Sequence, residues 1–275
     1  MDSAPGPLVL FGAGNMGGAM AAGWLAGAPK DPPWIVDPKP SAQVAAWASA
    51  GRIVLNPAPQ PAGILVIAVK PQMFDDVLPA LRAWTGAQTL ALSIMAGVSL
   101  ARLTESLGTP RCLRVMPNTP GAIGKGVALM SPSPACTERD VATARALLSP
   151  LGHVEGPMDE ATLQAATGLS GCGPAYVFLL AEVLAAAAED LGVPAEMATR
   201  LAAQTVEGSA ALMAASDAGP GELRRAVTSP RGVTEAALQV LMADGAMPSL
   251  FSSALQAALD RDAALSAGDE DKHGS

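Results

Sequence analysis

Residues 7–17 read Pro-Leu-Val-Leu-Phe-Gly-Ala-Gly-Asn-Met-Gly, and this stretch decides the fold. A short apolar run, which predicts a buried strand, stops at a glycine, and small and apolar residues at helical spacing follow over 15–26. Glycines at such a turn bring the backbone close to a pyrophosphate, and the helix N-terminus supplies N–H donors and a partial positive charge. The G-x-G-x-x-G spacing therefore predicts a dinucleotide-binding loop, the alternative being a glycine-rich turn that serves packing only. Its residues are Gly12, Ala13, Gly14, Asn15, Met16 and Gly17.

Short apolar strands and helices alternate over the first half of the chain. Strands are expected at 34–36, 52–55, 64–69, 89–94 and 111–116, with one more at 127–130, and helices at 41–50, 72–84, 100–107 and 138–148. This alternation predicts a parallel sheet covered by helices on both faces. Beyond about residue 156 no convincing strand follows, and helices are expected at 159–191, 194–216, 220–227 and 233–266. We therefore predict an α/β fold with a Rossmann-type dinucleotide-binding domain over 1–157, followed by an all-α domain over 158–275.

Composition excludes several classes of protein. The net charge of −8 argues against a nucleic-acid partner. No apolar run approaches the ~20 residues of a membrane span, because Glu182 interrupts the best candidate, 177–188. The N-terminus has no signal-peptide pattern, and the three cysteines have no paired spacing, so we expect a cytoplasmic protein with reduced thiols. Only two histidines are present, one in a polar tail and His153 in the expected loop between domains, which argues against a metal site or a histidine-based triad.

Asp37 ends the second expected strand, 20 residues after Gly17. An acid at this place usually bonds the ribose hydroxyls of NAD and repels the 2′-phosphate of NADP. Lys39, two residues on, could instead pair with that phosphate, and Asp37 could simply form the turn before Pro38. The sequence leaves open whether the cofactor is NADP(H) or NAD(H).

Four later segments, together with the glycine loop, resemble the Δ1-pyrroline-5-carboxylate reductase family over about residues 7–266. They are 68–72 (Ala-Val-Lys-Pro-Gln), 114–120 (Arg-Val-Met-Pro-Asn-Thr-Pro), 169–176 (Leu-Ser-Gly-Cys-Gly-Pro-Ala-Tyr) and 227–234 (Val-Thr-Ser-Pro-Arg-Gly-Val-Thr). The resemblance implies reduction of a cyclic imine to L-proline, the last step of proline biosynthesis. It also implies that the helical domain interleaves with that of a second copy and completes the active sites of a homodimer, which in this family can assemble further.

The resemblance also assigns residues. On the cofactor side, Asp37 and Asn56 match positions near the adenosine, and a second group matches positions near the nicotinamide: Ala68, Val69, Lys70, Pro71, Met95 and Ala96. On the substrate side, Glu160 matches an acidic position, and Ser229, Gly232, Val233 and Thr234 match a loop whose N–H groups receive the substrate carboxylate. Thr234 matches the catalytic hydroxyl that reaches the ring nitrogen.

Three positions depart from the family pattern. Cys172 stands for a serine, a swap that is conservative in size. Arg231 stands for a glycine, and either it is strained by a positive φ or its guanidinium adds a cation near the substrate carboxylate. Asp37 stands where the family often has a small hydroxyl residue, which puts the usual preference for NADP in doubt.

The lysines favour an imine substrate independently of the resemblance. Reduction of a ketone yields an alkoxide and needs a strong proton donor, yet the helical domain has no lysine before Lys272 in the tail. A protonated cyclic imine accepts hydride directly, so that a threonine hydroxyl and backbone N–H groups suffice. Two alternatives remain, a reductase of another cyclic imine and a non-catalytic nucleotide-binding dimer.

Overall fold

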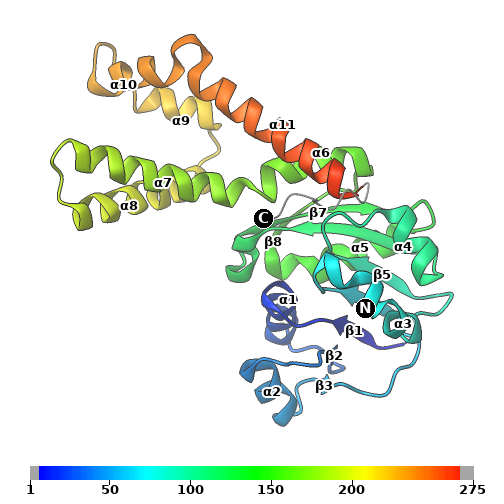
Figure 1. Cartoon of the computed structure of the whole chain (residues 1–275). Helices are drawn as coiled ribbons and strands as arrows, with labels where there is room; N and C mark the ends of the chain where they lie inside the picture. The colour runs from blue at the N-terminus through cyan, green and yellow to red at the C-terminus, as the bar shows by residue number, and fades with distance from the viewer. Residues whose placement is uncertain (1–5, 267–275) are drawn as a thin grey trace, which may run out of the picture. The chain divides into compact units, whose positions relative to one another are not determined.

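The computed structural model describes residues 6–266 (Figure 1). Within that range the chain forms two compact units. Residues 6–171 and 259–266 make up the first unit, and residues 172–258 make up the second. The boundary between the dinucleotide-binding domain and the all-α domain, placed between residues 157 and 158 in the sequence analysis, stays a prediction.

An eight-stranded sheet forms the centre of the first unit, in the order β3-β2-β1-β4-β5-β6-β7-β8. The strands pair in parallel, with Leu10 of β1 beside Val66 of β4, except that β6 and β7 run antiparallel. Their bounds are Leu8–Phe11 (β1), Trp34–Val36 (β2), Val54–Leu55 (β3), Ile64–Ile67 (β4), Leu90–Ser93 (β5), Cys112–Pro117 (β6), Gly126–Pro132 (β7) and Gly152–Glu155 (β8).

Two features of the sheet correct the sequence analysis. The sheet is not wholly parallel, because only residues 118–125 join β6 to β7, and a parallel crossover needs a dozen residues or more. Strand β8 lies where a loop between domains was expected. Only Val154 of its four residues is buried, so the sequence carried no strand pattern there. His153 therefore lies on β8, where its exposed ring contacts Glu155, with Nε2 2.9 Å from Oε2.

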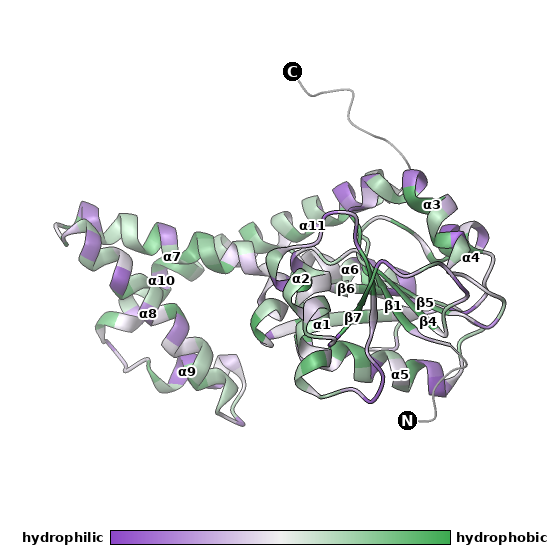
Figure 2. Ribbon diagram, turned by 90° about the horizontal axis from the view of Figure 1, so that it is seen from below, coloured by the Kyte–Doolittle hydropathy of each residue, from purple (hydrophilic) through white to green (hydrophobic). Residues whose placement is uncertain are grey.

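Helices cover both faces of the sheet, as predicted. Alternate residues of β1 show this, because Leu10 packs in a cluster with Met20 and Trp24, whereas Val9 packs in a second cluster with Phe74. Figure 2 shows the central strands coloured as hydrophobic along their length. The helices of this unit are Asn15–Ala26 (α1), Ala42–Ser49 (α2), Phe74–Ala83 (α3), Leu100–Leu107 (α4), Glu138–Leu148 (α5) and Glu160–Ser170 (α6), with short 3-10 turns at Pro71–Met73 (η1), Thr119–Ile123 (η2) and Ser149–Leu151 (η3).

The second unit is helical, as expected, but two of its long helices are interrupted. Residues 159–191 divide at Gly171 and Cys172, just before Pro174, which lacks the N–H that a continuous helix needs. Residues 233–266 divide at Asp244, where φ is +47°. The elements are Gly173–Asp190 (α7), Ala195–Ala214 (α8), Pro220–Ala226 (α9), Val233–Met242 (α10), Ala243–Gly245 (η4) and Ala246–Ser266 (α11), the last of which ends within the first unit.

The stretch 160–190, which contains α6 and α7, is long and apolar enough to cross a membrane by length and composition alone. This stretch was not predicted from the sequence, because Glu182 interrupts its longest apolar run. Only 6% of its most apolar window is buried. Several large apolar side chains of α7 are accordingly exposed: Val177, Phe178, Leu179, Leu180, Val183 and Leu184.

Candidate dinucleotide and substrate sites

The carboxyl edge of the sheet brings the predicted cofactor segments together. The chain leaves β1 toward β2 and leaves β4 toward β5, so the order reverses between β1 and β4, which is where α/β sheets bind ligands. The N–H of Ala68 donates to Phe11 O at 2.8 Å, and that of Ile94 donates to Ile67 O at 3.0 Å. The loops that follow β1, β4 and β5 therefore lie side by side.

The glycine loop follows β1 and is shaped by close backbone contacts. Gly12 has a φ of +93°, and a Cβ there would lie 2.8 Å from Ala68 O. A Cβ at Gly17 would lie 2.3 Å from Gly12 O. At Gly14, in contrast, a Cβ would meet nothing within 4 Å. The outer glycines are thus required by packing, whereas Gly14 faces open space.

The N-terminus of α1 fits a pyrophosphate. Gly14 is its N-cap and supplies no capping side chain, and the first turn carries no acidic residue. No hydrogen bond from the described part of the chain satisfies the N–H groups of Asn15 and Met16. These donors, the helix dipole and the open space at Gly14 suit a dianion that spans the loop.

Asp37 and Asn56, which are predicted to lie near the adenosine, contact each other and the glycine loop at this edge. Asp37 Oδ2 accepts from the Ala13 N–H and Oδ1 accepts from the Lys39 N–H, both at 2.8 Å. The Asn56 side chain accepts from the Asp37 N–H at 2.8 Å and donates to the Asp37 carbonyl at 2.9 Å. Asn56 itself has a φ of +48°, a conformation that asparagine tolerates better than most residues. The predicted neighbourhood of Gly12–Gly17, Asp37 and Asn56 is therefore present.

The segments on the nicotinamide side contribute mainly backbone. Lys70 is exposed, Pro71 begins η1, and Ala68 and Val69 are partly buried beside the glycine loop. Met95 is only 1% exposed and its side chain packs in the core, so it can offer a ligand only its main chain. Ala96, the next residue, is partly exposed.

Glu160 belongs to a charged cluster that the sequence analysis missed. Its Oε1 accepts from the Leu100 N–H at 2.9 Å and from Arg114 Nη1 at 3.1 Å. The Arg114 side chain is 6% exposed, and its Nη2 lies 4.0 Å from Asp262 Oδ2, a buried oxygen without a hydrogen-bond partner. The sequence does carry a signal for this cluster, because Arg114 is a charged residue inside a predicted strand, and a buried charge requires a partner. Oε2 of Glu160 receives no hydrogen bond from the described residues.

The substrate loop predicted over 227–234 lies in the second unit. The Gly232 N–H donates to Ser229 O at 3.0 Å, and a Cβ at Gly232 would lie 2.9 Å from that same backbone oxygen, so the turn requires glycine. Gly232 is also the N-cap of α10 and offers no capping side chain. Val233 is 90% exposed and Thr234 is exposed in the same turn. The four predicted residues are therefore grouped around one open helix N-terminus.

Arg231 precedes this turn in a strained conformation. Its φ is +58°, and its N–H donates to Glu235 Oε2 at 2.6 Å. Of the two alternatives for this position, the structure shows the positive φ, and the role of the guanidinium stays a prediction. Across the residues that the structure describes, no group of three or more His, Cys, Asp or Glu side chains is arranged to hold a metal ion.

Comparisons with known proteins agree with both halves of this arrangement. Residues 7–97 match the family described as NADP oxidoreductase, coenzyme F420-dependent, and residues 160–265 match the family described as pyrroline-5-carboxylate reductase dimerisation. The pyrroline-5-carboxylate reductase of Pseudomonas aeruginosa is 37% identical over 263 residues, which is 94% of this chain and 96% of that protein.

Solved structures agree as well. A pyrroline-5-carboxylate reductase from Coxiella burnetii superposes with a TM-score of 0.85 at 29% identity, covering 95% of this chain and 98% of the other. The Plasmodium falciparum enzyme, solved with NADP bound, gives 0.76 at 27% identity, covering 95% and 99%. With these identities over nearly its whole length, the chain belongs to the pyrroline-5-carboxylate reductase family.

Proposed function

We propose that this chain reduces Δ1-pyrroline-5-carboxylate to L-proline with NADPH or NADH, as the last step of proline biosynthesis. One observation carries the proposal. In a chain of this family, an open dinucleotide cradle is combined with a substrate loop that offers backbone N–H groups and hydroxyls but neither lysine nor histidine. Residues 172–258 contain no lysine or histidine, so the second unit suits a substrate that needs no strong acid.

The chemistry divides between the cofactor and the chain. The bound reduced nicotinamide supplies a hydride, which forms the new C–H bond at C5 of the ring while the C=N π electrons become the lone pair on nitrogen. The N–H groups of Gly232, Val233 and Thr234 are proposed to receive the substrate carboxylate. The Thr234 hydroxyl accepts from the N–H of the protonated imine and holds the ring in place, and this proton stays on the product amine.

Glu160 is proposed to take part in substrate binding, because it matches an acidic substrate position of the family. Arg114 and the Leu100 N–H fix its carboxylate through Oε1. That leaves Oε2 of a side chain that is 33% exposed to face the cationic ring nitrogen. Arg114 would then act as a positioning residue, because it holds Glu160 rather than the substrate.

An interleaved homodimer is the assembly that we propose, with higher assembly left open. The second unit has a very small core of its own, in which Ala185, Ala198 and Ala202 are its only described buried apolar residues. Three alanines supply too little buried area to hold a helical unit together. The exposed apolar side chains of α7 would be covered by a second copy, in agreement with the dimerisation family that residues 160–265 match.

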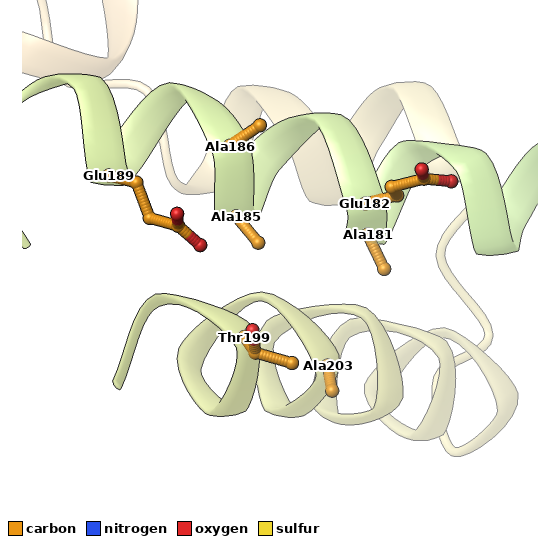
Figure 3. A pocket seen from close by; sticks show the side chains of 7 residues that line it. All are labelled: Ala181, Glu182, Ala185, Ala186, Glu189, Thr199 and Ala203. Carbon is orange, nitrogen blue, oxygen red and sulfur yellow. The ribbon is translucent and has the colours of Figure 1, made fainter. Parts of the chain in front are cut away.

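A groove between α7 and α8 fits this assembly. Figure 3 shows the side chains that line it, which are mostly alanines together with Thr199, Glu182 and Glu189, and its volume is about 380 Å³. Ala181 and Ala185 of α7 face Thr199 and Ala203 of α8 across it. Small side chains of this kind let another helix approach closely.

We propose a cytoplasmic location and neither membrane nor nucleic-acid partners. The free cysteines are compatible with a reducing compartment, and the net charge of −8 disfavours binding to nucleic acid. A second copy would account for the exposed apolar face without a lipid bilayer.

The direct test is the purified protein with pyrroline-5-carboxylate and either NADH or NADPH, followed by cofactor absorbance and by proline analysis. We expect cofactor oxidation and proline formation in equal amounts. Oxidation with a six-membered cyclic imine but not with pyrroline-5-carboxylate would favour another imine reductase. Dinucleotide binding without oxidation of either cofactor by any imine would favour a non-catalytic dimer.

A further inference from the structure

We infer that Asp37 makes NAD(H), rather than NADP(H), the preferred cofactor of this chain, an inference that rests on the proposed function. Asp37 follows β2 at the carboxyl edge of the sheet, next to the glycine loop. Because its carboxylate is fixed there by the fold itself, it can discriminate between a ribose with a free 2′-hydroxyl and one with a 2′-phosphate.

Two backbone donors fix the carboxylate, one on each oxygen. Oδ2 accepts from Ala13 in the glycine loop, and Oδ1 accepts from Lys39. The Asn56 side chain holds the main chain of Asp37 through both its N–H and its carbonyl. Turning the carboxylate away from a ligand would therefore leave two backbone N–H groups without their acceptor. Such a side chain does not move aside for a larger group.

The same geometry suits a ribose diol and opposes a phosphate. A carboxylate oxygen accepts two hydrogen bonds, so each oxygen of Asp37 keeps one acceptor position beside its backbone donor. The 2′- and 3′-hydroxyls of NAD(H) can donate to these positions. A 2′-phosphate is an anionic acceptor, and it would meet a fixed anionic acceptor.

Cationic side chains near this position are few. Lys39 is exposed, and its backbone N–H is the one that donates to Asp37. Arg52 precedes β3 at the opposite edge of the sheet, and its Nη2 donates to Leu25 O at 2.9 Å. Between β2 and β3, the cation that could reach a 2′-phosphate is thus the ammonium group of the exposed Lys39 side chain. An arginine commonly accommodates the 2′-phosphate in such folds, and Arg52 lies at the other edge of the sheet.

The test measures binding of NAD⁺ and NADP⁺ separately, by calorimetry on the intact oligomer without substrate. It compares wild type with Asp37→Asn, Asp37→Ser and, as a matched control, Lys39→Gln. Asp37→Asn keeps one oxygen for the Ala13 N–H, removes the charge and replaces the oxygen that accepts from Lys39 by an NH2 group, whereas Asp37→Ser removes the charge with a smaller side chain. Thermal melting of each variant shows that it is folded, and kcat/KM with NADH and NADPH provides a second readout.

We expect wild type to bind NAD⁺ about tenfold more tightly than NADP⁺, a factor that corresponds to about 1.4 kcal/mol. Asp37→Asn and Asp37→Ser should each shift this ratio toward NADP⁺ by about tenfold or more. Lys39→Gln should weaken NADP⁺ alone. Tighter binding of NADP⁺ by the wild type, or a ratio that stays within about twofold in both Asp37 variants, would overturn the inference while leaving the reductase intact. Failure to bind either nucleotide would overturn both the inference and the proposed function.

Discussion

The substitution Gly14→Ala separates cofactor binding from folding. Gly14 has a φ of −68°, which any residue adopts, and a Cβ there would meet nothing within 4 Å. Alanine is a poorer N-cap than glycine by up to about 1 kcal/mol, and the lower entropy of the unfolded chain offsets part of this, so the melting temperature should stay within about 4 °C of wild type. The new methyl group would nevertheless occupy the space in front of the N–H groups of Asn15 and Met16.

The magnitude follows from these two donors. Hydrogen bonds to a charged group contribute about 1.5–3 kcal/mol each, so losing two at the lower bound weakens dinucleotide binding by about 3 kcal/mol. That loss corresponds to a dissociation constant about 100-fold higher. The assay is calorimetric titration with the dinucleotide, with Gly18→Ala as the control. A Cβ at Gly18 would make only an ordinary contact, 3.4 Å from Ala13 O. Wild-type affinity in a folded Gly14→Ala protein would refute the assignment of this helix N-terminus to the pyrophosphate.

Three further predictions concern the substrate loop and the stability of the first unit. Thr234→Ala should lower kcat by about 100-fold, the scale of one hydrogen bond lost from the transition state, while dinucleotide affinity is retained. Thr234→Ser should restore most of the turnover, and unchanged turnover in Thr234→Ala would remove the hydroxyl from the mechanism. Arg231→Gly should remove the strain of a positive φ and stabilise the protein by about 0.5–1 kcal/mol, measured by thermal unfolding. A lower melting temperature of the variant would contradict this strain. A rise in KM would show that the guanidinium also attracts the substrate carboxylate. Burial raises the pKa of Asp140, but the hydrogen bonds from the Arg111 guanidinium and from Thr137 outweigh it, so this pKa lies below its ordinary value. The stability that this lowered pKa provides is present at neutral pH and is lost as the pH falls below about 4. Asp140→Asn should therefore reduce the free energy of unfolding at pH 7 by about 2 kcal/mol and weaken the loss of stability in acid. Equal urea unfolding curves for the wild type and the variant would contradict this prediction.

The sequence predicted most of the fold because its signals were local. Short apolar runs and a glycine loop between a strand and a helix specify β1, α1 and β2 without reference to the rest of the chain. The direction of β7 depends on the length of its connection, and β8 depends on pairing with β7, which no short window of sequence reveals. The break between α6 and α7 has a local signal in the sequence as well, because Pro174 cannot donate the N–H that a continuous helix needs.

The candidate sites were predictable to a similar degree. Motif spacing identified the glycine loop and Asp37, whereas the loop that contains Thr234 was implied by the resemblance to the family. What it could not supply were contacts between residues far apart in sequence, such as the Ala13 N–H on the Asp37 carboxylate or Arg114 between Glu160 and Asp262. Such contacts decide whether a charged side chain is mobile or fixed, and they require the three-dimensional fold.

Transfer of deuteride tests the central claim most directly. The purified protein is supplied with pyrroline-5-carboxylate and nicotinamide cofactor deuterated at C4 of the reduced ring, each face in turn, and the product is examined by mass spectrometry and NMR. Our account predicts proline that carries one deuterium at C5, from one face of the cofactor only. Proline without deuterium from either face, or no proline at all, would contradict direct hydride transfer to the imine.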